Sequence, residues 1–193
     1  LAQRARARPR IGLAQVQVQR REAALDIEVP HDDAVAVLLD LQPRGQGQTQ
    51  VTHSAALLFL VTGLTPISVA AMAEPFELAV DLADAVVTRF DNGAIGSLGS
   101  TGSVLPGHDE ILEYRIFGSA GHILFDVNEG VAVIHGLRGE VHRLPGLPAE
   151  ERYPDWAPAD NLVDVVLGRG QNGSPASLGV LTVEFVDAIY RAA

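Results

Sequence analysis

The residues with the clearest chemical potential lie between Gly45 and His53, in the run Gly-Gln-Gly-Gln-Thr-Gln-Val-Thr-His. The two glycines would let the backbone approach a ligand closely, and glutamine and threonine side chains supply neutral donors and acceptors suited to hydroxyl groups. The candidate substrate-binding residues are Gln46, Gln48, Thr49 and Gln50. His53 is the candidate catalytic residue, because a neutral imidazole near the positive end of a helix could accept a proton from an alcohol. Spacing alone favours a simpler interpretation, in which His53 packs or caps and the glutamines form a solvated loop.

A helix is expected to position these residues. Apolar residues recur at helical spacing from Thr49 to Thr62, with Thr49 as the predicted N-cap and Gly63 placed to end the helix. The segment is almost entirely apolar, so we expect this helix to be buried against a sheet.

Short alternating segments after Pro66 predict a series of β-strands. These segments are 67–73, 78–90, 94–100, 111–117, 122–127, 131–135 and 139–144. The Asp91-Asn92-Gly93 run predicts a hairpin turn, and two helices are expected at 158–167, capped by Asp160, and at 175–192. The order of elements indicates an α+β fold, with one large, mostly antiparallel open sheet and helices packed on one face.

The region before the Gly45 run is less regular. Residues 12–20 alternate and predict a further strand, whereas the apolar segment 34–41 fits a buried strand or a short helix equally well. We expect residues 1–10 to form a basic N-terminal stub and residues 11–193 to form a single domain. The sequence begins with Leu1 and its methionine is Met72, so we expect a fragment, a processed product or a shortened chain.

One glycine-rich run has the spacing of a dinucleotide-binding loop, from Gly168 to Gly173. Such a loop works only between a buried strand and a helix, and here it follows a helical pattern. We therefore predict a helix–helix connection and no Rossmann unit in this chain. No metal site is predicted either, because there is no cysteine and the histidine–acid clusters at His31 and His108 lie in loops without converging ligands.

The amino-acid composition limits the classes of binding partner that we expect. The first 21 residues hold six of the 14 arginines and no acid, so the rest carries eight arginines against 24 acids and would repel a phosphate backbone. We expect no nucleic-acid partner. No apolar run approaches the roughly 18 residues that span a membrane, and the lack of cysteine suits a cytoplasmic location.

Several stretches together resemble the C-terminal domain of the glucose–fructose oxidoreductase/inositol dehydrogenase (Gfo/Idh/MocA) family. The run ending at His53 is similar to the family's glycine-rich loop and catalytic helix, and matching on the histidine places His53 on the catalytic position. The other similar stretches are 10–18, 117–121, 161–164 and 178–190. The resemblance implies a substrate-binding and oligomerisation domain that forms a homo-oligomer through its open sheet face. It also implies NAD(P) for a complete family member, held by a Rossmann domain that would be a partner chain or a missing N-terminal half.

The sequence also departs from the family pattern. The family's acid position holds Thr49, two glycine positions hold Pro43 and Arg44, and the chain contains no lysine to pair with His53. We therefore expect no cofactor to bind to this chain alone, and no redox chemistry without a second polypeptide or half. The leading hypothesis is the substrate-side domain of an NAD(P)-dependent oxidoreductase-like protein that acts on a sugar, polyol or related hydroxyl compound. The alternative is a non-catalytic scaffold, partner subunit or sugar-binding module derived from that family.

Overall fold

The computed structural model describes residues 14–15, 45–103, 107–108, 110–152 and 154–193. These residues fall into two compact units, one of which combines the chain up to Ser103 with Ala176–Ala193, while the other spans Val104–Pro175. The predicted segment 34–41, most of the predicted strand at 12–20 and the basic stub at 1–10 lie outside the described residues. The single-domain boundary of 11–193 thus stays a prediction.

The first unit contains a four-stranded antiparallel sheet in the order β1-β2-β3-β4. Its strands are β1 (Ala14–Gln15), β2 (Pro66–Glu74), β3 (Ala83–Phe90) and β4 (Ile95–Thr101). Burial alternates along β3, because successive side chains point to opposite faces of a sheet. The predicted hairpin is confirmed: β3 and β4 join through Asp91–Gly93, where Gly93 has a φ of 86° that favours glycine.

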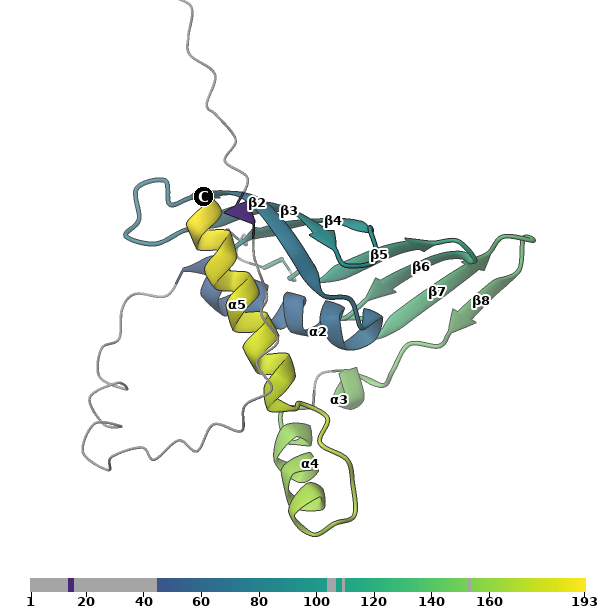
Figure 1. Cartoon of the computed structure of the whole chain (residues 1–193). Coiled ribbons are helices and arrows are strands. Elements are labelled where there is room, and N and C mark those ends of the chain that lie inside the picture. The colour runs from purple at the N-terminus through teal and green to yellow at the C-terminus, as the bar shows by residue number, and fades with distance from the viewer. Residues whose placement is uncertain (1–13, 16–44, 104–106, 109, 153) are drawn as a thin grey trace, which may run out of the picture. The chain divides into compact units, whose positions relative to one another are not determined.

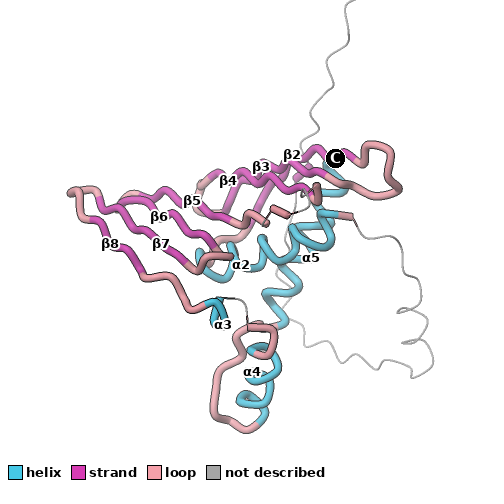
Figure 2. Tube along the Cα trace, turned by 180° about the vertical axis from the view of Figure 1, so that it is seen from behind, coloured by secondary structure: helices cyan, strands magenta, loops and turns pink. Residues whose placement is uncertain are grey.

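Helices cover one face of this sheet (Figures 1 and 2). They are the single-turn π-helix η1 (Gly47–Val51), its continuation α2 (Thr52–Thr62), and α5 (Ala176–Ala192). The core of the unit forms where these helices pack on the sheet, and its members are Val51, Ala55, Phe59, Val69, Val86, Phe90, Phe185, Val186, Ala188 and Ile189. The predicted end of α2 is confirmed, since Gly63 adopts a left-handed conformation with a φ of 66° and its N–H donates to the Phe59 carbonyl.

The second unit contains another four-stranded antiparallel sheet, in the order β5-β6-β7-β8. Its strands are β5 (Glu113–Gly118), β6 (Gly121–Asp126), β7 (Val131–Gly136) and β8 (Val141–Leu144). Two helices follow, α3 (Ala149–Arg152) and α4 (Ala157–Val166). A row of stacked rings crosses this sheet, with the ring centroids of His122 and His135 4.5 Å apart and those of Phe117 and His122 5.4 Å apart.

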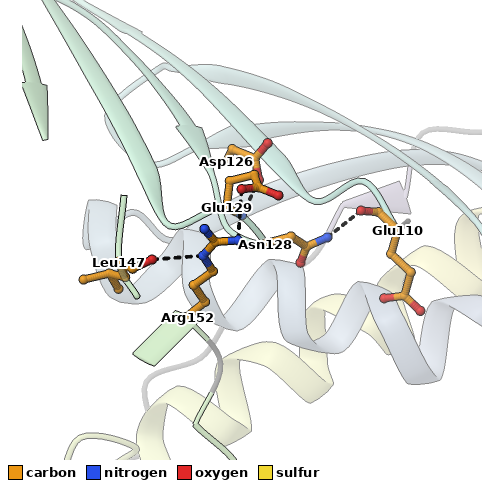
Figure 3. A network of polar contacts seen from close by, with 6 residues as sticks. All are labelled: Glu110, Asp126, Asn128, Glu129, Leu147 and Arg152. Carbon is orange, nitrogen blue, oxygen red and sulfur yellow. Dashed lines mark hydrogen bonds and ion pairs between the residues drawn. The ribbon is translucent and has the colours of Figure 1, made fainter. Parts of the chain in front are cut away.

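A polar network ties the turns of the second unit together (Figure 3). Arg152 of α3 pairs with Glu129 at 3.0 Å and donates to the Leu147 carbonyl at 3.0 Å. The Glu129 N–H donates to Asp126, and the neighbouring Asn128 side chain donates to the Glu110 carbonyl. These contacts join α3, the β6–β7 turn and the segment before β5, so we interpret the network as structural.

The predicted α+β class is confirmed, and every strand pairing in the described part of the chain is antiparallel. The strands assemble into two four-stranded sheets where one broad sheet was predicted, because alternation identifies a strand but does not determine which edges pair. The strand predicted from Leu78 begins at Ala83, after a loop. Asp160 does not cap α4, which starts earlier, after Trp156.

Candidate functional site

The candidate site lies where η1 begins, and this helical stretch starts before Thr49. The prediction that Thr49 is the N-cap is wrong: its hydroxyl lies within the first helical turn and donates to the Gly45 carbonyl at 3.0 Å. Thr52 bonds back to the Gln48 carbonyl in the same way, at 2.8 Å. The opening turn is π-helical, a rare conformation that occurs often at functional sites.

Asp81, which is distant in sequence, takes the capping role. Its carboxylate accepts from the Gly47 N–H at 2.7 Å through Oδ2, and its carbonyl accepts from the Gln46 N–H at 3.0 Å. Oδ1 accepts from the Tyr190 hydroxyl at 2.7 Å, and that hydroxyl in turn accepts from the Gln48 N–H at 3.1 Å. Three consecutive N–H groups of the helix start are thereby satisfied, and the carboxylate opposes the positive helix end.

The two glycines of the run serve this internal contact. A Cβ at Gly45 would lie 1.8 Å from Oδ1 of Asp81, and a Cβ at Gly47 would lie 2.7 Å from the Tyr190 hydroxyl oxygen. We interpreted the glycines as room for a ligand, but the structure shows that the protein's own carboxylate and phenol occupy this space. Alanine at either position would push Asp81 or Tyr190 away from the helix start.

A second carboxyl group, that of Asp84, interacts with the carboxyl group of Asp81. Asp84 is 4% exposed on the inner face of β3, and neither of its carboxyl oxygens has a hydrogen-bond partner among the described donors. Burial, and next the charge and hydrogen bond of Asp81, raise the pKa of Asp84 to about 6. Burial and Asp81 likewise raise the pKa of Tyr190, so its hydroxyl stays protonated and can donate.

The predicted site residues are placed as follows. Gln46 is half-buried and its amide donates to the Ser100 hydroxyl at 2.8 Å, whereas Gln48, Thr49, Gln50 and His53 are exposed. These four exposed residues lie close together along the chain, three of them in the π-helical turn η1 and His53 in the first turn of α2. The arrangement offers a hydroxyl, an amide and an imidazole to solvent on a helix whose start is anchored.

Sequence reasoning missed Asp81, Asp84 and Tyr190. Asp84 occupies an inward position in the alternation that continues through Val86 and Thr88, so an acid in a buried row was the available signal. This signal was obscured because the strand was predicted to begin at Leu78, so Asp81 was assigned to the same strand. The pairing of Asp81 with Tyr190 spans 109 positions and has no local signal.

Other candidate features do not form sites. A shallow groove of about 300 Å³ lies at the opposite end of α2, lined mainly by apolar side chains such as Phe59, Leu64 and Leu181. The Gly168–Gly173 run follows α4 without a strand, as predicted, and the Asn161 side chain bonds to its backbone. Within the described ranges, no cluster of three metal-ligating side chains occurs, and no helix is long and apolar enough to cross a membrane.

The described residues do not fit a dinucleotide. A pyrophosphate site of the predicted kind needs a parallel strand, a glycine turn and a helix N-terminus in succession. Both described sheets are antiparallel, and the start of η1 is already occupied by Asp81.

The fold of this chain is similar to one part of several solved oxidoreductases. No family model matches the chain, and no curated protein matches it. Among solved structures, UDP-N-acetylglucosamine 3-dehydrogenase from Acidithiobacillus ferrooxidans is similar at a TM-score of 0.63 and 14% identity, over 74% of this chain and 45% of its own.

Two further structures extend the comparison. Levoglucosan dehydrogenase in complex with NADH and levoglucosan is similar at a TM-score of 0.61 and 20% identity, over 78% of this chain and 48% of its own. Aldose-aldose oxidoreductase from Caulobacter crescentus, complexed with glycerol, is similar at a TM-score of 0.58 and 22% identity, over 74% of this chain and 43% of its own. The chain thus spans less than half the length of these relatives. At this identity the comparisons establish the fold alone. They confirm the resemblance seen in the sequence as a resemblance of fold.

Proposed function

We propose that this chain is the substrate-side domain of an NAD(P)-dependent oxidoreductase-like protein that acts on a sugar, polyol or related hydroxyl compound. The observation that carries the proposal is the exposure of Thr49, Gln50 and His53 on a helix anchored by Asp81. Hydroxyl and amide groups bind substrate hydroxyls, and His53 accepts the proton of the alcohol. Gln46 and Gln48 complete the proposed binding set, with Gln46 acting from its bond to Ser100.

The nicotinamide cofactor would be bound outside the described residues, by a Rossmann domain on a partner or on a missing half of the protein. It would supply the hydride acceptor, and this chain would bind and orient the hydroxyl compound. The fold shared with the sugar oxidoreductases supports this division, because the chain covers less than half of each. A cytoplasmic location and the absence of a nucleic-acid partner belong to the same proposal.

Polyol binding without cofactor tests the proposal. We expect calorimetry of the purified chain with glycerol and a set of sugars to detect binding. Loss of one neutral hydrogen bond costs about 1 kcal/mol, so Gln50→Ala should weaken binding about fivefold. Gln171→Ala is the matched control, because Gln171 is an exposed glutamine in the other unit and should leave the Kd unchanged.

Two outcomes would contradict this assignment. Absence of binding for every compound would remove the substrate role and leave the scaffold alternative, which the lack of lysine and the Thr49 substitution favour. Tight binding of a nicotinamide cofactor to the chain alone would show that the cofactor site had been assigned to the wrong part of the protein.

We also propose that the chain forms a homo-oligomer through the outer face of the β2–β4 sheet. This face carries exposed Met72, Val87 and Ile95, which are 67%, 52% and 66% exposed. The residues around them on this face are small, namely Ser68, Ala70, Ala85, Ser97 and Gly99, except for Arg89, which pairs with Ile95. A sheet face with exposed apolar side chains suits packing against a second sheet.

Val87→Arg should convert the oligomer to monomer in sedimentation velocity, because it places a charge in the middle of the proposed interface. Val61→Arg is the control, since Val61 is 61% exposed on α2, away from the outer face of the sheet. A wild-type chain that sediments as a monomer at high concentration would contradict the oligomer. An oligomer that survives Val87→Arg would contradict this choice of face.

A further inference from the structure

Asp84 is a buried carboxyl group with no described counter-charge. It lies on the inner face of β3, opposite Ala73 of β2 and Ser100 of β4, and is 4% exposed. Neither carboxyl oxygen has a hydrogen-bond donor among the described residues. An ionised carboxylate in such a place would be strongly disfavoured, because burial removes the water that stabilises its charge.

The nearest acid makes ionisation harder still. The charge of Asp81 and its hydrogen bond with Asp84 raise the pKa of Asp84 further, and both Asp81 oxygens already accept, one from the Gly47 N–H and one from the Tyr190 hydroxyl. Two carboxyl groups in contact cannot both ionise without repulsion, so a single proton is left on the one that has no donor.

We propose that Asp84 keeps its proton and donates it to Asp81, and that this carboxyl–carboxylate pair positions the start of the candidate-site helix. The titratable groups described around Asp84 are Asp81, from the loop before β3, and Tyr190, from α5. The strand partners of Asp84 are neutral, Ala73 of β2 and Ser100 of β4, and the Ser100 hydroxyl accepts from the neutral Gln46 amide. The proposal does not depend on the oxidoreductase function, since it concerns only the proton and the helix start.

The pair predicts how stability changes with pH. The pKa of Asp84 is raised from 3.8 to about 6 on folding, so the folded state holds a proton that the unfolded state releases. This contribution to stability is fully present below pH 4 and is lost as the pH rises through about 6. A difference of about two pKa units corresponds to a factor of about 100 in the unfolding equilibrium constant.

The direct test is a ¹³C NMR titration of the side-chain carboxyl groups in the purified chain. We expect Asp84 to titrate near pH 6 in the wild type, and nearer its ordinary value in Asp81→Asn, which removes the neighbouring charge. A midpoint at or below 4 for Asp84 in the wild type would overturn the proposal. An unchanged midpoint in Asp81→Asn would show that no proton is shared.

Asp84→Asn is the matched variant for positioning, because its amide mimics the protonated acid and can donate to Asp81. Wild type and variant should be equally stable at low pH, and the variant should gain up to about 100-fold in the unfolding constant by pH 8. Amide protection at Gly47, corrected for intrinsic exchange, should fall from pH 5 to pH 8 in the wild type only. A pH-independent difference between the two proteins in both measurements would contradict the positioning role.

Discussion

Phe59→Ala should destabilise the first unit by about 3–5 kcal/mol, the usual cost of removing a buried aromatic ring. Phe59 is 3% exposed and packs edge-to-face on Phe185, with ring centroids 5.3 Å apart. This pair joins α2 to α5, and the same two helices position the candidate site through Tyr190. The alanine variant leaves a cavity between them and also removes the aromatic pair, which contributes about 0.5–1.5 kcal/mol beyond its buried area.

Urea unfolding followed by far-UV circular dichroism measures this loss. Fluorescence would report on the other unit, because the only tryptophan, Trp156, lies there. Leu60→Ala is the control: Leu60 neighbours Phe59 but is 55% exposed, and its loss should cost under about 1 kcal/mol. If the alanine variant fails to fold, Phe59→Leu should give a smaller, measurable loss. Equal effects at Phe59 and Leu60 would contradict the described core.

The elements of the fold were largely predictable from sequence because their signals are local. The alternation from Ala83 to Phe90, the Asn92-Gly93 turn and the helix stop at Gly63 each involve residues close in the chain. Pairing between strands is not local, and the prediction of one sheet failed at that point. The start of the helix was misplaced for a similar reason, because its cap comes from Asp81, more than thirty positions away.

The candidate site was predictable only in part. The predicted helix is present and Thr49, Gln50 and His53 are exposed on it, but its first turn is π-helical, which the sequence pattern did not predict. The glycines were assigned to a ligand because a sequence does not show which group approaches a backbone. The structure instead brings Asp81 and Tyr190 to them. The proton proposed on Asp84 depends on β3, the loop before β3 and α5 together, so no single segment of the sequence reveals it.

His53→Ala is expected to lower kcat by about 10²–10⁴ in any assembly in which this chain oxidises a polyol, since a general base contributes that much. In the resemblance to the Gfo/Idh/MocA family Thr49 stands at the position of an acid, and its hydroxyl is already bonded to the Gly45 carbonyl. We therefore expect a loss toward the lower end of that range. The measurement is steady-state turnover with saturating cofactor, with kcat and KM determined separately.

Two variants separate proton transfer from packing and binding. His53→Gln keeps a polar side chain that can hydrogen-bond a hydroxyl but not accept its proton, so kcat should fall as in the alanine variant while KM changes little. His108→Ala removes an exposed histidine of the other unit and should leave both constants unchanged. Full turnover in His53→Ala would exclude the proton-accepting role. A rise in KM alone would reassign His53 to substrate binding, together with Thr49 and Gln50.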